Sequence, residues 1–232
     1  MIPEKRGELR MLTLYKEKAP VSGVLFDMDG LVVDSEWMYS RFWREACMVY
    51  GFPMTKAQSL QMRSLNHTLG QKKLHALFGE KADYETIRKK RIELMDAYVL
   101  ENGVAPKPGI FELLDALDAR HIPRAVTSSS PQTRIRAYLE PLGLYHRFGT
   151  IVTAYDVPHG KPEPDIYLKG AQVLGLTPGS CLALEDSPSG ILSASRAGCL
   201  SVVIPDQDQP DEDTLSRVYA RADSLRDIIG LL

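Results

Sequence analysis

Helices and short apolar runs alternate along the second half of the chain, and this alternation constrains the fold more than any other feature. The apolar spacing beyond Ile110 predicts helices over residues 110–120, 133–139, 165–174 and 190–196. The apolar runs that follow them are residues 125–127, 150–152, 181–184 and 200–204. Strands joined by helices run parallel, and such a sheet is covered by helices on both faces. The sequence therefore predicts an α/β core built on a parallel sheet.

An earlier apolar run, Val21 to Phe26, is separated from this region by a stretch with helical signals alone. The apolar spacing within this stretch predicts helices over residues 36–50, 65–78 and 84–100, with Ser35 as the N-cap of the first helix. Residues 101–109 contain the breakers Gly103, Pro106, Pro108 and Gly109, which make a stiff connector. We therefore expect an all-helical cap over residues 36–103, inserted into a core formed by residues 20–35 and 104–232.

The bulk properties of the chain argue against several classes of protein. Its 232 residues carry a net charge of -2, which gives no reason to expect nucleic acid or an anionic membrane as partner. No apolar stretch approaches the length of a membrane span. Cys47, Cys181 and Cys199 are too few and scattered for a disulfide framework, which predicts buried thiols in a cytoplasmic protein. Residues 1–19 lack the apolar core of a secretory signal and are expected to form a frayed tail.

Two carboxylates, Asp27 and Asp29, follow the first apolar run directly. Alternate side chains of a strand point to the same side, so these carboxylates would be neighbours that require a cation or a shared proton. Gly30 then allows the backbone to turn or to approach a ligand closely. Asp and Gly also favour ordinary turns. This segment alone therefore leaves two interpretations open: a plain turn, or a nucleophilic carboxylate beside an acid/base carboxylate with a metal ion between them.

Polar groups of complementary chemistry follow three further predicted strands. They are Ser128, Ser129 and Ser130, then Lys161, then Glu185 with Asp186. Each group also has an ordinary explanation: the serines as a helix cap, the lysine as a solvated loop residue, and the acids as favourable charges at a helix start. Ligands of parallel sheets bind beyond the carboxyl ends of the strands. Four such groups at one edge therefore indicate a functional site.

The order of these motifs resembles that of the haloacid dehalogenase superfamily, especially its branch of small sugar-phosphate phosphatases and β-phosphoglucomutases. The resemblance spans Val21 to the C-terminus. It rests on Asp27-x-Asp29-Gly30 with Asp34-Ser35, Ser128, Gly160-Lys161-Pro162-x-Pro164-Asp165-x-Tyr167 and Glu185-Asp186-Ser187-x-x-Gly190. It implies a Rossmann-like core with an inserted cap and a Mg²⁺-dependent phosphoric monoester hydrolase. The substrate would be a small phosphorylated metabolite, a sugar phosphate or similar phosphomonoester.

The resemblance also implies roles for individual core residues. Asp27 would attack phosphorus and form an aspartyl-phosphate, and Asp29 would act as general acid and then as general base. Lys161 would neutralise the nucleophile and the phosphate as a catalytic point charge. Mg²⁺ would be held by Asp27, the backbone carbonyl of Asp29, and Asp186 assisted by Glu185, an all-oxygen set that suits this ion.

Phosphate and substrate contacts follow from the same resemblance. Ser128 and the amide of Ser129 would hold phosphate oxygens, with Thr127 as the alternative if the register differs by one residue. The expected substrate-binding residues are Gly30, Ser129, Tyr39, Arg63 and Asn66.

Related chemistries are weighed by the residues that they would need. Dehalogenases of the superfamily do not need an acid/base residue two positions after the nucleophile, so Asp29 disfavours that activity. Mutases of the β-phosphoglucomutase type place a histidine where this chain has Tyr39, and Arg63 lies about one turn from their cap arginine. We therefore favour a phosphatase, with a phosphosugar mutase and a non-catalytic phosphometabolite binder as alternatives. The oligomeric state stays open between a monomer and a weak oligomer.

Overall fold

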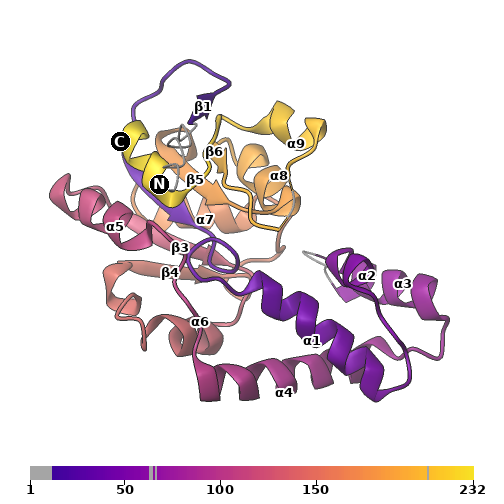
Figure 1. Cartoon of the computed structure of the whole chain (residues 1–232). Helices are drawn as coiled ribbons and strands as arrows, with labels where there is room; N and C mark the ends of the chain where they lie inside the picture. Colours follow the sequence, from indigo (N-terminus) through magenta and orange to yellow (C-terminus); the bar gives the residue numbers. More distant parts are fainter. Residues whose placement is uncertain (1–11, 63–64, 66, 208) are drawn as a thin grey trace, which may run out of the picture.

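The computed structural model describes residues 12–62, 65, 67–207 and 209–232, and within them a seven-stranded sheet forms the core (Figure 1). The strand order is β1-β7-β6-β5-β2-β3-β4. The strands are β1 (Thr13–Leu14), β2 (Gly23–Phe26), β3 (Arg124–Ser128), β4 (Thr150–Thr153), β5 (Cys181–Glu185), β6 (Leu200–Val203) and β7 (Ala220–Arg221). Neighbouring strands run parallel, except that β1 pairs antiparallel with β7. The predicted α/β class is confirmed.

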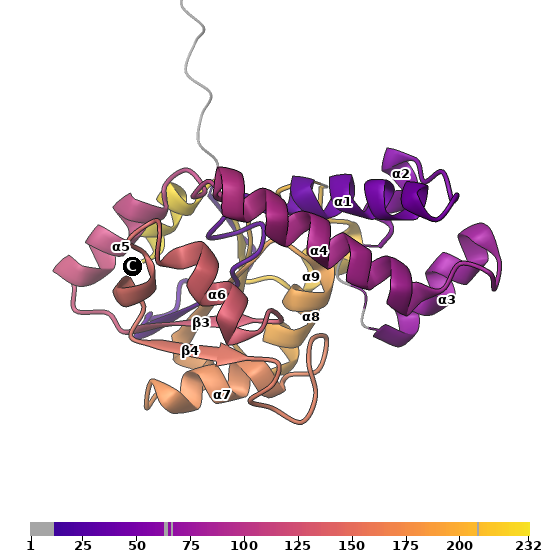
Figure 2. The same cartoon turned by 90° about the horizontal axis from the view of Figure 1, so that it is seen from below.

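Successive side chains of the central strands enter two different hydrophobic layers, because residues of a strand alternate between its faces. Val24 and Phe26 of β2 pack in one layer, and Leu25 packs in the other. The first layer is covered by α5 (Ile110–Ala119), α6 (Gln132–Leu139) and the 3-10 helix η3 (Leu225–Leu231). The second is covered by α7 (Asp165–Val173) and α8 (Pro188–Arg196). Figure 2 shows α6 and α7 on opposite sides of β3 and β4.

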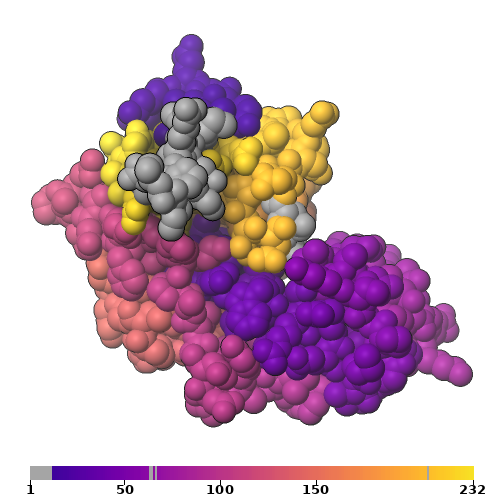
Figure 3. Space-filling view, in the orientation of Figure 1, coloured from indigo at the N-terminus to yellow at the C-terminus, as the bar shows by residue number. Residues whose placement is uncertain are grey.

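Four helices, here called the cap helices, lie between β2 and α5 in the chain. They are α1 (Glu36–Val49), α2 (Lys56–Leu60), α3 (His67–Phe78) and α4 (Tyr84–Asn102). α1 packs along α4, and the cap helices bury a hydrophobic cluster of their own that includes Trp43, Leu74 and Tyr84. In the space-filling view the first cap helices form a lobe beside the later part of the chain (Figure 3). No helix of the described residues is long and apolar enough to cross a bilayer.

Several local features differ from the sequence prediction. Thr13–Leu14 forms β1, although this segment was expected to belong to a frayed tail; its partner β7 is distant in sequence, so no local pattern could reveal the pairing. α2 was not predicted, and it begins with a capping box between Thr55 and Gln58. α9 (Glu212–Arg217), η1 (Tyr145–Arg147) and η2 (Pro178–Ser180) complete the described helices. Ser35 precedes α1 but makes no side-chain cap hydrogen bond.

Candidate active site

The strand register brings the predicted polar groups to one edge of the sheet. Phe26, the last residue of β2, pairs with Val126 of β3 and Leu184 of β5. Asp27 therefore follows β2 where Glu185 ends β5, and the backbone N–H of Asp27 donates to the carbonyl of Leu184 at 3.0 Å. Parallel pairing of adjacent strands is thus the reason that residues far apart in sequence share one site.

Lys161 links the buried carboxylates of this edge. Its ammonium donates to Oδ1 of Asp27, to Oε1 of Glu185 at 2.6 Å and to the carbonyl of Thr127 at 3.0 Å. These three bonds use the full donor capacity of an ammonium group. Burial by itself would lower the pKa of Lys161, but the carboxylates of Asp27 and Glu185 outweigh burial and raise it. Lys161 is therefore a permanent cation and not a lysine of the solvated loop surface.

Asp27 lies in an environment that disfavours its negative charge. Burial raises the pKa of Asp27 well above its ordinary value, and the carboxylates of Glu185 and Asp29 raise it further. Lys161 opposes this shift. One ammonium thus serves several acids, and a further cation at this edge would stabilise the ionised form of Asp27.

Glu185 is fully buried, and both of its oxygens are occupied. Oε1 accepts from Lys161 and from the hydroxyl of Tyr167 at 2.5 Å, while Oε2 accepts from the hydroxyl of Ser187 at 3.1 Å. Gly190 lies against this carboxylate so closely that a Cβ there would clash with it. Glu185 therefore fixes the Lys161 ammonium from the buried side of the site.

Asp27, Glu185 and Asp186 form a buried acidic cluster. Each offers one carboxylate oxygen, and the three oxygens lie within 4.8 Å of one another. Gly30 has a φ of +81° and passes so close to Asp186 that a Cβ would clash with its carboxylate, which explains the glycine at this position. Closely spaced carboxylate oxygens are donors that suit a hard divalent cation.

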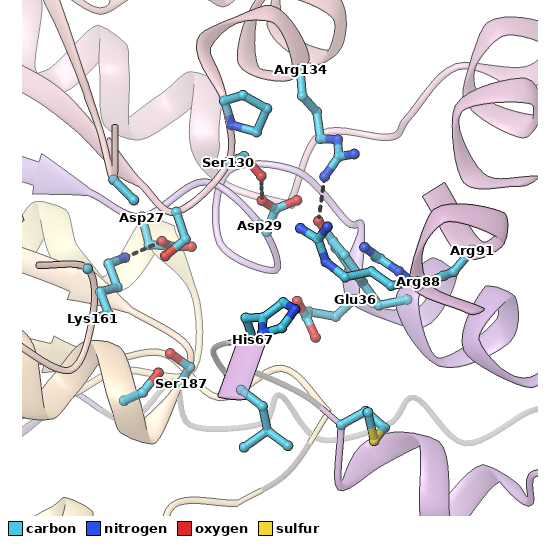
Figure 4. A pocket seen from close by; sticks show the side chains of 18 of the residues that line it. Asp27, Asp29, Glu36, His67, Arg88, Arg91, Ser130, Arg134, Lys161 and Ser187 are labelled. Carbon is cyan, nitrogen blue, oxygen red and sulfur yellow. Dashed lines mark hydrogen bonds and ion pairs between the residues drawn. The ribbon is translucent and has the colours of Figure 1, made fainter. Parts of the chain in front are cut away.

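Asp29 lies beyond β2, which ends at Phe26, and forms an isolated bridge with Val33 across the turn of residues 30–32. The turn is closed by the amide of Gly30, which donates to the carbonyl of Val33 at 3.0 Å. Asp29 is therefore not placed by strand alternation as predicted, yet Asp27 and Asp29 line the same cavity (Figure 4).

Two hydroxyls hold the Asp29 carboxylate. Ser35 donates to Oδ1 and Ser130 donates to Oδ2, each at 2.8 Å. The predicted capping residue Ser35 is thus directed to the site and not to the start of α1. The Ser130 contact was not predicted, because the serine run indicated either anion binding or a helix cap, and neither assigns Ser130 to the Asp29 carboxylate.

The residues at the end of β3 and directly after it separate into cavity-facing and occupied groups. Ser129 and Ser130 line the cavity. Ser128 is buried, and its Oγ accepts from the amide of Ser130 at 3.1 Å. The hydroxyl of Thr127 donates to the carbonyl of Phe26 at 3.2 Å, so it is engaged within the sheet.

A cavity of about 430 Å³ extends from these groups to the cap helices (Figure 4). Tyr39 lines it as a cap residue, and its contact with substrate stays a prediction, whereas Arg63 and Asn66 lie outside the described residues. Further residues line the cavity that were not predicted as site residues: Glu36, Trp43, His67, Tyr84, Arg88, Arg91 and Arg134. No local pattern distinguishes such side chains from ordinary surface or packing residues.

Comparison with known proteins identifies relatives that are named as phosphatases and as a mutase. Hexitol phosphatase A of Escherichia coli (strain K12) is 34% identical over 187 residues, which cover 78% of this chain and 82% of that protein. Fructose-1-phosphate phosphatase YqaB of the same organism is 31% identical over 179 residues, covering 76% and 93%. Beta-phosphoglucomutase of Bacillus subtilis (strain 168) is 27% identical over 198 residues, covering 82% and 85%.

Solved structures and a family model agree with these relatives. A haloacid dehalogenase family hydrolase from Deinococcus radiodurans, solved with bound phosphate and sodium, is 26% identical with a TM-score of 0.72, covering 92% of this chain and 98% of that one. A hydrolase from Pseudomonas syringae shares the fold, with a TM-score of 0.76 at 23% identity and coverage of 90% and 96%. Residues 24–204 match the model of haloacid dehalogenase-like hydrolases. The chain therefore belongs to the haloacid dehalogenase-like hydrolase family, as its motifs predicted.

Proposed function

We propose that this protein is a Mg²⁺-dependent phosphatase that hydrolyses a small phosphorylated metabolite, a sugar phosphate or similar phosphomonoester. The observation that carries this proposal is the contact of the Lys161 ammonium with the buried carboxylate of Asp27, inside the acidic cluster. A phosphate ester is dianionic, so an anionic nucleophile can approach it only where cations cancel the repulsion. Relatives named as phosphatases support the same activity.

Asp27 is the nucleophile in this proposal. One of its carboxylate oxygens attacks phosphorus, the bond from phosphorus to the ester oxygen breaks, and an aspartyl-phosphate forms. The leaving oxygen takes a proton from Asp29, which afterwards removes a proton from the water that attacks the aspartyl-phosphate. Inorganic phosphate and free Asp27 result. The hydroxyls of Ser35 and Ser130 support this role, because they fix both oxygens of the Asp29 carboxylate.

The other core residues bind and orient the phosphoryl group. The amide of Ser129 and the hydroxyl of Ser128 donate to phosphate oxygens; Ser128 Oγ only accepts in its bond with the Ser130 amide, so its O–H is available for this role. Lys161 neutralises part of the phosphate charge. Lys161 keeps this position because Glu185 and Tyr167 anchor it from the buried side.

The donor set supports Mg²⁺ as the cofactor. Asp27, Asp186 and the backbone carbonyl of Asp29 would hold the ion, and Glu185 assists by keeping Lys161 beside Asp27. Bound Mg²⁺ supplies positive charge that lowers the repulsion between the nucleophile and the phosphoryl oxygens.

A phosphosugar mutase is the second candidate, and the similarity to beta-phosphoglucomutase supports it. Tyr39 occupies the cap position at which a mutase of this type would need a histidine. Burial, reinforced by the charge of Asp29, raises the pKa of Tyr39 to about 12, so its phenol stays protonated at neutral pH. A group that cannot take up a proton is a poor replacement for histidine in acid/base chemistry, and this favours the phosphatase.

A phosphate-release screen over sugar and nucleoside monophosphates tests the proposal, with Mg²⁺ and with excess chelator. We expect at least one ester to be hydrolysed in the presence of Mg²⁺ and not in excess chelator. The Asp27→Asn substitution should abolish phosphate release, while the melting temperature of the variant stays near that of the wild type. An amide has neither the charge nor the nucleophilicity for the covalent step. A screen without any phosphate release, or an active Asp27→Asn variant, would overturn the mechanism. Conversion of a sugar monophosphate that needs catalytic bisphosphate and releases no phosphate would identify a mutase.

A further inference from the structure

We propose that the leaving group of the substrate carries a second anionic group, recognised by Arg88, Arg91 and Arg134. This inference rests on the proposed function, because it concerns the part of the phosphate ester that departs. The three arginines line the same cavity as Asp27, and Figure 4 shows them grouped on the side away from Asp27 and Lys161. We refer to them as the arginine cluster.

Arg91 is a buried guanidinium without a carboxylate partner among the described residues. Its exposure is 5%, and its Nε has no hydrogen-bond partner. The guanidinium carbon lies 4.9 Å from the ring centre of Tyr39 and 5.3 Å from that of Trp43. Burial lowers the pKa of Arg91, as does the repulsion of nearby arginines, while Tyr39 opposes the shift. The aromatic rings thus orient a charge that no acid of the described chain neutralises by an ion pair.

Arg134 and Arg88 add two more charges from different elements. Arg134, on α6, donates from Nη1 to the Tyr39 hydroxyl at 3.5 Å, and its Nη2 lies 3.7 Å from Oδ1 of the half-exposed Asp96. Arg88 lies about one turn before Arg91 on α4, so both reach the cavity from the same helix face. The two arginines of α4 take part in no ion pair of the described residues.

The charges on this side of the cavity are unbalanced. Glu36 of α1 is the carboxylate that lines the cavity between Asp29 and the arginine cluster (Figure 4). Three guanidinium groups thus line this side with one carboxylate, and the further ion pair with Asp96, which does not line the cavity, serves Arg134 alone. Gathering like charges at a partly desolvated site costs free energy, which an anionic ligand would offset. A neutral polyol could accept the N–H bonds but would leave the charges unbalanced.

The anion that fits the arginine cluster cannot be the phosphoryl group that reacts. Asp27, Lys161 and the serines after β3 already surround that group in the proposed mechanism. A guanidinium binds a carboxylate or a phosphate through two parallel hydrogen bonds, and both groups share this chemistry. The ligand class is therefore a phosphate ester whose leaving group ends in a carboxylate or in a second phosphate. Arg63, which the family resemblance indicated as a cap contact, plays no part in this inference.

Matched substrates and charge-removing variants test this inference. The substrates are an aldose phosphate, the phosphorylated aldonic acid of the same carbon count, the corresponding sugar bisphosphate, and a small aryl phosphate as reporter of the core chemistry. The variants are Arg88→Gln and Arg91→Gln, with Lys89→Gln as control, since Lys89 is exposed on the same helix and does not line the cavity. Arg88 is only half-buried, so its variant keeps the test valid if Arg91→Gln fails to fold.

We expect the wild type to favour one anionic sugar ester over the neutral one in kcat/KM. Each arginine variant should lower this preference about 10- to 100-fold, the range for a lost hydrogen bond to a charged group, and Lys89→Gln should leave it unchanged. The better of the two anionic esters identifies the anion as carboxylate or phosphate. Equal or better turnover of the neutral ester by the wild type overturns this inference alone, as do equal losses on neutral and anionic esters in the variants. Failure on every ester, the aryl phosphate included, instead overturns the proposed function and this inference with it.

Discussion

The ammonium of Lys161 lies 2.6 Å from Oε1 of Glu185, a carboxylate whose side chain has no exposed surface. Glu185 is therefore a buried anion that is stabilised by one lysine and by neutral hydroxyl donors. The same ammonium also contacts Asp27. Lys161 therefore both stabilises the buried Glu185 carboxylate and would support the proposed nucleophile.

Lys161→Met should unfold more easily and lose phosphate release. The methionine keeps the volume but leaves Asp27 and Glu185 buried without their shared cation. Removing one partner of a buried ion pair costs about 3–5 kcal/mol. Urea unfolding measures the change in the free energy of unfolding. Lys169→Met on α7 is the control, because the Lys169 ammonium donates to Gln172 and forms no ion pair with a described residue. Equal stability of the two variants would contradict the proposed importance of the Lys161 contacts.

Gly190→Ala should be destabilised even though alanine favours helices. A Cβ at this position would collide with the Glu185 carboxylate, which is held by its own hydrogen bonds and cannot move freely. Overpacking of this kind costs about 1–3 kcal/mol, which exceeds the helix-propensity gain of about 1 kcal/mol. In Gly179→Ala the nearest atom, the carbonyl oxygen of Gly198, is 3.8 Å away, so this control should melt like the wild type. A Gly190→Ala protein with unchanged melting temperature would show that Glu185 can relax.

Asp29→Asn should slow turnover by about 10²- to 10⁴-fold, the usual contribution of a general acid/base. The loss should be smaller for an aryl phosphate, because a good leaving group needs little protonation, provided that hydrolysis of the aspartyl-phosphate is not limiting. Ser130→Ala keeps the carboxylate and removes one of its two hydroxyl donors, so its loss should be smaller, about tenfold. Steady-state kinetics on an aryl and a sugar phosphate gives both ratios. If the losses for Asp29→Asn match on the two substrates, leaving-group protonation is not its role.

The three cysteines should resist thiol reagents until the protein unfolds. All three are buried, and burial raises the pKa of Cys47 to about 11 and that of Cys199 to about 12. As the pH rises, the unfolded chain loses these thiol protons before the folded protein does. The thiols thus favour the folded state below about pH 9, and that stability is lost as the pH rises toward about 11 for Cys47.

A thiol titration at about pH 8 in buffer and in denaturant tests this expectation. Reaction of one or more thiols in the folded protein at the rate of the denatured protein would show that the burial is not maintained in solution. Urea unfolding at rising pH provides the matching measurement of stability.

The sequence by itself determined the α/β class and the core of the site. Short apolar runs alternating with helical spacing leave few folds open, and parallel pairing then brings the ends of β2, β3 and β5 to one edge. Asp27 and Asp186 were predictable for this reason, because each directly follows a strand end. Lys161 was predictable from its Gly-Lys-Pro motif in the segment between β4 and α7. Local spacing carried that information because the edge of a parallel sheet is a fixed consequence of its topology.

The tertiary structure alone decided what surrounds these groups. β1 pairs with a strand at the other end of the chain, and Ser35 and Ser130 meet only at the Asp29 carboxylate. The arginine cluster gathers from α4 and α6, elements that no local pattern brings together. An arginine on a helix has the same sequence signal whether it meets solvent or a cavity. Its role depends on the packing of distant elements, and their arrangement exists only once the chain has folded.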